Sequence, residues 1–351
     1  MSRTYRILVA APQVPFLRGG AELHAELTVA ALRRAGHEVD LATLPYTWTG
    51  EIDSMNQALA WRLTNFEAAA PGPVDLVIAT KYPSYLARHP NKVAWVFHQQ
   101  REVYDLHPTA FGNFSLAEEH VALREALVEL DLEALAECRA LFTNSGNTAR
   151  RLEQYCGIDA TPLYAPPPLH DQLRTGAHGD YLFFIGRLDP LKRLDLTIEA
   201  LAQTKSAVTL KVAGRGPHGE ALQELAAKIG VEDRVEFLGF VSDEDVIELM
   251  AGCLGMVLTP HDEDYGFTTL EAFFAAKPVV TTTDAGGVLE WVEDGVTGFV
   301  VEPEPAQLAA RIDDLFTDRA GCERMGREGL ERVRERVSWD KALVALTSTL
   351  D

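Results

Sequence analysis

Two cationic side chains, Arg187 and Lys192, lie five residues apart in the stretch GRLDPLK. The stretch follows an apolar run, YLFFI, that is typical of a buried strand. Ligands of open α/β sheets bind outside the carboxyl ends of the strands, where such a turn lies. A guanidinium can bind two phosphate oxygens and an ammonium adds a point charge, so the pair suits a diphosphate. The alternative is ordinary surface pairing with Asp189 or Asp195.

Two carboxylates, Glu263 and Glu271, stand eight residues apart in the stretch EDYGFTTLEA. Glu263 follows the strand-like run GMVLTP, and Glu271 falls in the first turn of the helix that we predict next. Carboxylates can accept hydrogen bonds from sugar hydroxyls, the N-terminus of a helix binds anions, and Gly266 allows close backbone approach to a ligand. Thr268 is a good N-cap, so Thr268 and Glu271 also fit a capping box, in which Glu271 bonds only to backbone.

Further patterns near these residues have competing interpretations. Glu263 stands between Asp262 and Asp264, which imitates a D-x-D metal motif, but nothing nearby supplies a convincing additional ligand. We therefore expect no metal and no cofactor. The double glycine Gly286-Gly287 follows the run PVVTT. It either lets backbone approach a ligand or simply opens a helix.

The stretch from Gly214 to Gly219 matches the dinucleotide-binding pattern G-x-G-x-x-G letter for letter. In a dinucleotide-binding domain this turn follows the first strand of the sheet, whereas here it follows the second strand of its series. We interpret the glycines as a tight turn between a strand and a helix, and expect no bound NAD.

Short apolar runs alternate with helical patterns along the chain, which is typical of doubly wound parallel sheets. One series ends before a linker that contains three consecutive prolines, which neither a helix nor a central strand accommodates. A second series starts afresh after it. We predict Rossmann-like domains over residues 1–165 and 170–335, and an amphipathic helix over residues 338–351 that could pack back on the first domain.

The overall composition excludes some classes of partner. A net charge of −20 argues against binding to nucleic acid or to an anionic membrane. The four cysteines have no metal-ligand spacing and are typical of reduced thiols. The first apolar run is too short for a signal peptide, and no segment approaches the roughly 20 apolar residues of a membrane helix. We expect a cytoplasmic protein without a transmembrane segment. Peripheral contact with a membrane is compatible with this sequence.

Taken in order, the motifs GRLxxxK, GxGP, FLGFV, E-x7-E, GGxxE and DGxTGFVVEP closely resemble family 4 of the retaining glycosyltransferases, also called glycosyltransferase group 1. The N-terminal GGAE and the tail helix with Trp339 fit as well, so the resemblance covers essentially the whole chain. It implies the GT-B fold, in which two Rossmann-like domains face each other across a cleft. The first domain would bind the acceptor and the second the nucleotide sugar.

The resemblance also implies catalytic roles for side chains at matching positions. Arg187 and Lys192 would hold the donor diphosphate. Glu263 would bind hydroxyls of the donor sugar, and Glu271 the ribose. His98, in the stretch AWVFHQQ, would contact the transferred sugar. Without the resemblance, the sequence favours an ordinary surface or loop histidine at this position.

Backbone groups would complete the donor site. The N–H groups of Phe267 and Thr268 would meet the distal phosphate, and Val241, in GFV, would lie beside the nucleotide base. Gly19 and Gly20 would lie across the cleft, near the phosphates and the acceptor. Acceptor contacts would come from loops such as 44–56 and 101–116.

Two positions depart from the family pattern. Asp264 stands where the family usually has Gly or Pro, which would alter the preferred donor sugar, and His261 stands where Ser is common. The sequence assigns no role to His261.

These features together predict a retaining, metal-independent glycosyltransferase that moves a hexose-type sugar from a UDP- or GDP-sugar to an unidentified acceptor. Its product would be a glycan, a glycolipid or a glycosylated metabolite. The alternatives are an inverting GT-B enzyme, and a non-catalytic protein or partner subunit that binds nucleotide sugars.

Overall fold

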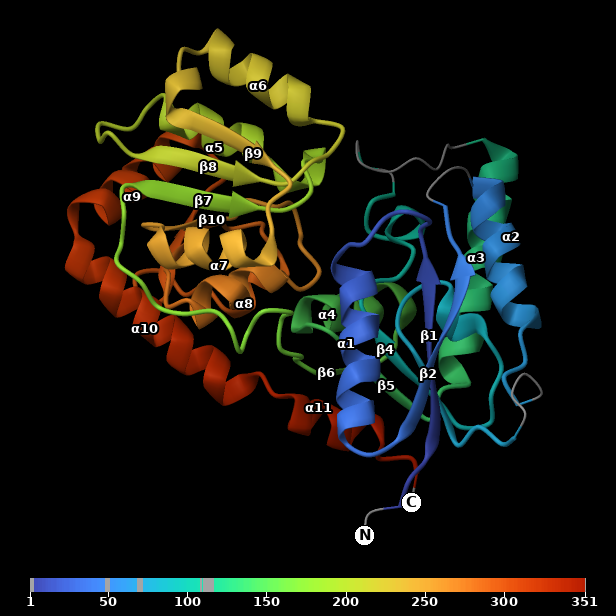
Figure 1. Ribbon diagram of the computed structural model, residues 1–351. Coiled ribbons are helices and arrows are strands. Elements are labelled where there is room, and N and C mark those ends of the chain that lie inside the picture. The colour runs from blue at the N-terminus through green and yellow to red at the C-terminus, as the bar shows by residue number, and fades with distance from the viewer. Residues whose placement is uncertain (1–2, 48–50, 68–71, 108, 110–116, 351) are drawn as a thin grey trace. The chain divides into compact units, whose positions relative to one another are not determined.

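Each half of the chain folds around a parallel sheet of its own (Figure 1). The computed structural model describes residues 3–47, 51–67, 72–107, 109 and 117–350. The chain divides into two units, Met1–Pro168 with Ser338–Asp351, and Leu169–Val337. The division falls beside the three prolines of the linker that we predicted from the sequence.

The sheet of the first unit has the strand order β2-β1-β3-β4-β5-β6. Its strands are β1 (Arg6–Gln13), β2 (Glu38–Pro45), β3 (Leu76–Ala79), β4 (Lys92–Val96), β5 (Ala140–Thr143) and β6 (Thr161–Pro162). Its helices are α1 (Gly20–Arg34), α2 (Glu51–Leu63), α3 (Glu118–Ala136), α4 (Gly146–Cys156) and α11 (Trp339–Leu346), with the short 3₁₀ helices η1 (Ser84–Leu86) and η2 (Arg101–Val103).

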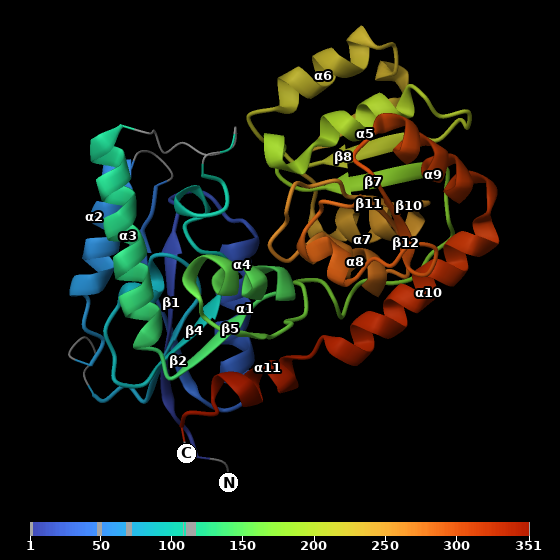
Figure 2. The ribbon, with the colours of Figure 1, turned by 180° about the vertical axis from the view of Figure 1, so that it is seen from behind.

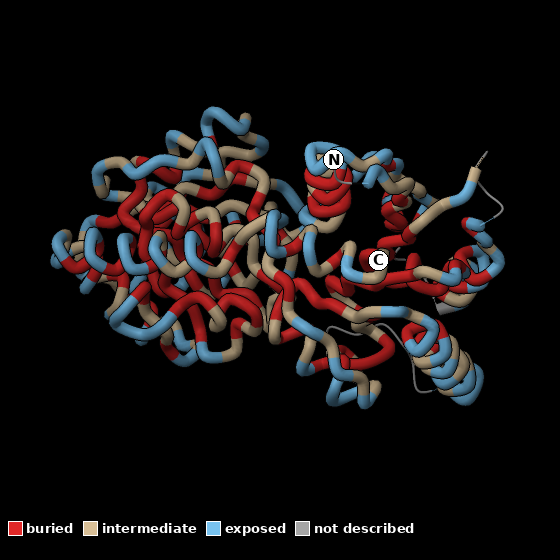
Figure 3. The backbone as a smooth tube through the Cα atoms, turned by 90° about the horizontal axis from the view of Figure 1, so that it is seen from below, coloured by how far each residue is buried: buried red, intermediate tan, exposed pale blue. Residues whose placement is uncertain are grey.

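Alternate residues of the first sheet enter two separate cores. On β3, for example, Val77 belongs to the core under α2 and α3, whereas Ile78 belongs to the core under α1 and α11. This is the alternation that a strand buried on both faces must show. Figure 3 shows the buried residues at the centre of each unit and exposed residues along the outer sides of the helices.

The C-terminal helix α11 belongs to the first unit. Its Ala342 is fully buried in the core that also contains residues of α1. The ring of Trp339 lies 6.3 Å from the rings of both His24 and Trp95. Burial among these rings lowers the pKa of His24 to about 3, so that the imidazole is neutral. The chain thus returns to its first unit after it has completed the second.

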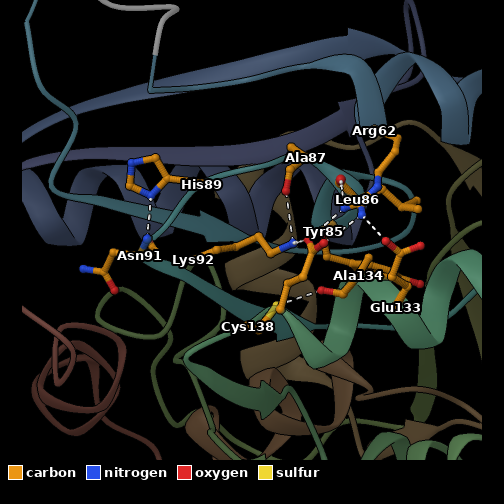
Figure 4. A network of polar contacts seen from close by, with 11 residues as sticks. Arg62, Tyr85, Leu86, Ala87, His89, Asn91, Lys92, Glu133, Ala134 and Cys138 are labelled. Carbon is orange, nitrogen blue, oxygen red and sulfur yellow. Dashed lines mark hydrogen bonds and ion pairs between the residues drawn. The ribbon is translucent and has the colours of Figure 1, made fainter.

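A network of charged groups, in which Arg62 and Lys92 are buried and the carboxylates are exposed, joins α2, α3 and β4 (Figure 4). The Lys92 ammonium donates to the carbonyl oxygens of Tyr85 and Ala87, at 2.7 and 3.0 Å. It lies 3.4 Å from the Glu137 carboxylate, which also accepts two hydrogen bonds of 2.7 Å from Arg62. These hydrogen bonds hold the pKa of Glu137 below its usual value. Because Lys92 begins β4, the network lies at the amino ends of the strands and stabilises the scaffold.

The sheet of the second unit has the strand order β12-β11-β10-β7-β8-β9. Its strands are β7 (Tyr181–Ile185), β8 (Thr209–Ala213), β9 (Val235–Gly239), β10 (Gly255–Val257), β11 (Val279–Thr282) and β12 (Gly298–Val301). Its helices are α5 (Leu194–Leu201), α6 (Gly219–Lys228), α7 (Asp243–Gly252), α8 (Phe267–Phe274), α9 (Pro305–Thr317) and α10 (Arg319–Arg336), with η3 (Pro190–Lys192), η4 (Glu232–Arg234) and η5 (Gly287–Glu290).

Helices cover both faces of the second sheet, with α5 and α6 on one face and α7 and α8 on the other (Figures 1 and 2). All strand pairs in both sheets are parallel, as the sequence predicted. Among the residues described, no helix is both long and apolar enough to span a bilayer.

Candidate functional site

The strand order of the second unit creates a crevice between β7 and β10. These two strands are neighbours, but the chain leaves β7 toward β8 on one side and β10 toward β11 on the other. Ligands of open α/β sheets bind outside the carboxyl ends of the strands at such a switch point. The loop after β7 carries Arg187 and Lys192, and the loop after β10 carries Glu263. The topology therefore places three predicted site residues on two adjacent loops.

Lys192 and Glu263 contact each other directly. The Lys192 ammonium donates a short hydrogen bond to the Glu263 carboxylate, and the side chains are 29% and 21% exposed. Burial acts to lower the pKa of Lys192, but the paired Glu263 outweighs it, helped by Asp189 and Asp264, so the pKa is raised. Lys192 thus stays protonated, and its partner is another predicted site residue rather than Asp189 or Asp195.

Arg187 lies on the same loop and is more accessible. Its side chain is 50% exposed, and its Nε lies 3.9 Å from the Asp189 carboxylate, a loose ion pair of the kind expected at a surface. An exposed guanidinium in a loose pair can turn toward an incoming anion at low cost.

Glycines of the GxGP turn bring a second loop against the Arg187 loop. A Cβ on Gly214 would lie 1.9 Å from the carbonyl oxygen of Gly186, and one on Gly216 would lie 2.2 Å from that of Leu188. Gly214 also has a φ of +127°, which side chains disfavour. The glycines are therefore required for close packing of two turns, in agreement with our interpretation of the fingerprint-like pattern.

The helix after the Glu263 loop begins earlier than we predicted. Its N-cap is Gly266, in the left-handed region with φ of +77°, and α8 starts at Phe267. Thr268 is therefore the second helical residue and not the N-cap, which corrects the sequence prediction. The physical reason is that glycine takes a positive φ without steric cost, so the chain turns into the helix at Gly266. The N–H groups of Phe267 and Thr268 occupy the first turn, where the helix offers them no carbonyl.

The same shift removes the predicted capping box around Glu271. Glu271 is the fifth residue of α8, beyond the first turn, and its carboxylate makes no hydrogen bond to another residue within the described parts of the chain. Its side chain is half-buried, and burial raises the pKa of Glu271 to about 7, with a further contribution from Asp243. The carboxyl is thus a poorly solvated group without a capping function.

The double glycine after β11 packs against the Glu263 loop. Gly287 N–H donates to the Glu263 carbonyl at 2.7 Å, and a Cβ on Gly287 would lie 2.4 Å from the Asp264 carbonyl oxygen. Gly286, with φ of +64°, caps the short helix η5. The double glycine thus opens the short helix η5, and its backbone also supports Glu263.

Val241 lies in the connection between β9 and α7. It borders a cavity of about 530 Å³, whose other lining residues include Leu238, Phe240, Asp245 and Glu248. The predicted base-binding segment is thus adjacent to a hollow with apolar and acidic walls.

Three predicted residues belong to the first unit. Gly19 is the N-cap of α1, and its N–H donates to the Glu22 carboxylate at 2.9 Å, while Gly20 is the first residue of the helix. His98 follows β4, is half-buried, and has its Nδ1 2.6 Å from the Gln99 carbonyl oxygen. All three lie at carboxyl ends of strands. Of the acceptor loops named above, residues 48–50, 108 and 110–116 lie outside the described residues.

Sequence reasoning missed one cluster beside the Lys192–Glu263 pair. Arg193 binds the Asp284 carboxylate through two nitrogens, at 2.6 and 2.7 Å, and His261 Nδ1 lies 3.5 Å from the same carboxylate. Asp284 follows β11, so the cluster joins three loops. Its only sequence signal was the basic residue directly after Lys192. Within the described residues, no group of three or more His, Cys, Asp or Glu side chains is arranged to hold a metal ion.

Comparison with known proteins gives three kinds of similarity. Residues 169–332 match the family model described as Glycosyl transferases group 1. The chain is 33% identical over 176 residues to the D-inositol 3-phosphate glycosyltransferase of Frankia alni, covering 46% of this chain and 43% of the relative. It is 34% identical over 122 residues to the alpha-1,3/1,6-mannosyltransferase ALG2 of Dictyostelium discoideum, covering 35% and 29%. The chain thus spans less than half the length of these two relatives.

The fold is similar along the whole chain to that of Anabaena Alr3699/HepE, solved in complex with UDP and glucose. The TM-score is 0.74 at 20% sequence identity, with 99% of both chains covered. This chain contributes two six-stranded parallel sheets with helices on their faces to the superposition. The predicted GT-B fold is therefore confirmed.

Proposed function

We propose that the chain is a member of the glycosyl transferases group 1, whose family model matches residues 169–332, and that it moves a hexose-type sugar from a nucleotide-diphosphate donor to an acceptor. The observation that carries the proposal is the Lys192–Glu263 pair at the switch point between β7 and β10, with the first turn of α8 following the Glu263 loop. This arrangement offers a cation, a carboxylate and backbone N–H groups on two adjacent loops.

Phosphate binding falls to the cations and to the helix terminus. The Lys192 ammonium has three N–H donors, of which Glu263 uses one, so the others can donate to phosphate oxygens. Arg187 can turn to the same diphosphate, and the N–H groups of Phe267 and Thr268 suit its distal phosphate. Negative charge grows on the diphosphate as it leaves, and these fixed donors would stabilise it most in the transition state.

Sugar recognition falls to the two carboxylates. Glu263 is fixed by Lys192 and by the backbone bond from Gly287, so one carboxylate oxygen can accept from a hydroxyl of the donor sugar. Glu271 has no capping function and suits the two hydroxyls of the ribose. Asp264, in place of the usual Gly or Pro, would change which sugar is preferred.

We propose that the transfer retains the configuration at the anomeric carbon and needs no metal. The bond between the anomeric carbon and the phosphate oxygen breaks, and its electron pair stays on the diphosphate. The acceptor oxygen bonds to the anomeric carbon on the same face, and a donor phosphate oxygen takes the acceptor proton. His98, Gly19 and Gly20 of the first unit would contact the sugar, the phosphates and the acceptor.

The similar proteins support a nucleotide-sugar donor, and we propose that the nucleotide is UDP or GDP. The HepE structure is a complex with UDP and glucose. The two relatives are named as a D-inositol 3-phosphate glycosyltransferase and an alpha-1,3/1,6-mannosyltransferase. We propose a cytoplasmic enzyme of glycan, glycolipid or glycosylated-metabolite synthesis, and leave its acceptor unnamed.

The experiment that tests the function starts from calorimetry with UDP, GDP, ADP and dTDP. The sugar nucleotides of the tightest binder are then incubated with the enzyme, without acceptor, and the released sugar is followed by NMR. We expect slow hydrolysis that gives the α-anomer first from an α-linked donor. Release of the β-anomer would indicate inversion, and binding without any turnover would indicate a non-catalytic protein or partner subunit.

A further inference from the structure

Arg193 stands in an unusual backbone conformation directly after Lys192. Its φ and ψ are +47° and +44°, in the left-handed region that favours glycine. An arginine there carries a conformational cost that glycine would avoid. The guanidinium must therefore provide interactions that offset this cost.

The Arg193 guanidinium joins the ends of three strands. Nε donates to the Thr259 carbonyl at 2.9 Å and Nη2 to the Pro260 carbonyl at 3.0 Å, both in the segment after β10. Nη2 also donates to Thr282 Oγ1 at 3.0 Å, and two nitrogens bind the Asp284 carboxylate. The Arg193 side chain is only 18% exposed. A planar guanidinium reaches all these acceptors at once, with one N–H of Nη2 shared between two of its three acceptors, which the point charge of a lysine cannot do.

Backbone hydrogen bonds continue from this cluster to the site. His261 N–H donates to the Leu191 carbonyl at 2.8 Å, Asp262 N–H to that of Asp284 at 2.8 Å, and Glu263 N–H to that of Ala285 at 3.2 Å. The segment that leads to Glu263 is thus held on one side by the Lys192 loop and on the other by the loop after β11. Arg193 belongs to the Lys192 loop, and its guanidinium binds both the start of this segment and the loop after β11.

We propose that Arg193 is a positioning residue that fixes Lys192 and Glu263 relative to each other, with Asp284 as its anchor. The proposal rests on the function proposed above for Lys192 and Glu263. Arg193 follows Lys192 in sequence and binds the carbonyl groups of Thr259 and Pro260, which lie four and three residues before Glu263. It therefore sets the distance between a cation and a carboxylate that come from different loops.

A second arginine of the same unit serves as the matched control. Arg234 donates to the carbonyl groups of Leu201 and Val208 and to Thr204 Oγ1, at 2.6 to 3.2 Å. These groups lie between the end of α5 and the start of β8, at the amino end of that strand. Arg193 and Arg234 are thus both half-buried arginines that donate to backbone carbonyl groups, and of the two only Arg193 adjoins the site.

The test compares Arg193→Lys, Asp284→Asn and Arg234→Lys by amide hydrogen exchange in the full-length protein without ligand. We expect the amides of residues 261–263 to exchange at least tenfold faster in the first two variants and at the wild-type rate in Arg234→Lys. Unchanged exchange at 261–263 in Arg193→Lys would overturn the proposal. This measurement needs no substrate, so it judges Arg193 even if no nucleotide sugar is ever turned over.

Kinetics then show whether Arg193 acts through Glu263. In the wild-type background Arg193→Lys should lower kcat about a hundredfold with little change in the affinity for the bare nucleoside diphosphate. In the Glu263→Gln background the same change should cost less than about threefold, because the group that it positions is already altered. Arg234→Lys should lower the melting temperature and be additive with Glu263→Gln. Additive losses for Arg193 as well would contradict the positioning role.

Discussion

Lys192 and Glu263 form an ion pair although 71 residues separate them in the sequence. The pair exists because β7 and β10 are neighbours in the sheet, so that the loops after the two strands leave it side by side. Half-buried ion pairs of this kind depend on both partners, since removal of one leaves a poorly solvated charge. The pair therefore connects the loops after β7 and β10, and it is also the centre of the proposed donor site.

Replacing Lys192 by Ala should abolish most transfer. Loss of a charge-assisted phosphate contact in a dry site costs roughly 2–4 kcal/mol of transition-state stabilisation, or about 30- to 900-fold in kcat/KM. The affinity for the bare nucleoside diphosphate should fall as well. Steady-state kinetics and calorimetry measure the two effects, with circular dichroism to confirm that the variant is folded.

Lys211→Ala is the matched control for this prediction. Lys211 also pairs with a glutamate of the same unit, with its Nζ 3.6 Å from the Glu236 carboxylate, but it lies in the middle of β8. Its loss should leave kcat/KM within about twofold of wild type. Near-normal turnover in Lys192→Ala would remove the basis for the diphosphate assignment.

Glu263→Gln should separate sugar binding from nucleotide binding. Glutamine keeps the length of the side chain and can still accept a hydrogen bond from Lys192, but the bond is weaker without the negative charge. We expect the bare nucleoside diphosphate to bind as tightly as it does to wild type, while transfer falls at least tenfold. A large loss of nucleotide affinity would instead assign Glu263 to the phosphates.

Transfer should be insensitive to excess EDTA. In the proposed mechanism, two cations and the N–H groups in the first turn of α8 stabilise the negative charge on the leaving diphosphate, so no metal is needed. Activity assayed after chelation and gel filtration tests this. Complete loss with recovery on adding Mg²⁺ or Mn²⁺ would instead indicate that Asp262 and Asp264 are ligands.

The sheets and the loops that carry the site could be predicted from the sequence, because alternating apolar runs and breakers are local signals. The sequence predicted the site residues of each loop separately, but it did not predict which residues of different loops contact each other. That Lys192 would meet Glu263, and not Asp189 or Asp195, depends on the strand order, which no local pattern encodes. The resemblance to a family supplied residue roles, but it gave no contact between them.

The wrong N-cap predicted for α8 and the failure to single out Arg193 have the same origin. Thr268 has the better side chain for an N-cap, yet the left-handed conformation at Gly266 ends the loop first. Arg193 stands at a position with positive φ, where propensity argues for glycine. In both cases the backbone conformation is set by the packing of neighbouring loops, which overrides local preference.

Two glycine substitutions should separate packing from dinucleotide binding in the GxGxxG stretch. A Cβ on Gly216 would lie 2.2 Å from the Leu188 carbonyl oxygen, whereas one on Gly219 would be in ordinary contact, 3.5 Å from Leu188 Cδ1. We expect Gly216→Ala to displace the Arg187 loop and lower transfer at least tenfold, and Gly219→Ala to remain near wild type. Equal effects of both, or binding of NAD in calorimetry, would revive the dinucleotide interpretation.

Glu271→Gln tests whether the half-buried carboxyl of α8 binds the ribose. Burial raises the pKa of Glu271 to about 7, above its usual value of 4.5. The native state therefore holds a proton between these two values that the unfolded state has lost, and the free energy of unfolding falls as pH rises through about 7. Glutamine cannot ionise, so the variant should melt at or above the wild-type temperature at pH 8. Glu224→Gln, on the exposed face of α6, is the control and should change neither melting nor binding.

Nucleotide binding should show the opposite dependence on pH from stability. A carboxylate that accepts from two ribose hydroxyls must be ionised, so binding to wild type expels the proton of Glu271. With a pKa of about 7, the ionised fraction of Glu271 rises from about a tenth at pH 6 to about nine tenths at pH 8, and the affinity for the nucleotide should rise about tenfold over that range.

Calorimetry in buffers of different ionisation enthalpy measures the released proton directly. In Glu271→Gln we expect weaker binding, no proton release beyond that of the nucleotide itself, and a correspondingly flatter pH profile. If the variant binds like wild type at pH 8 and releases the same number of protons at pH 6, then Glu271 lies outside the ribose site, and its raised pKa reflects burial and the charge of Asp243.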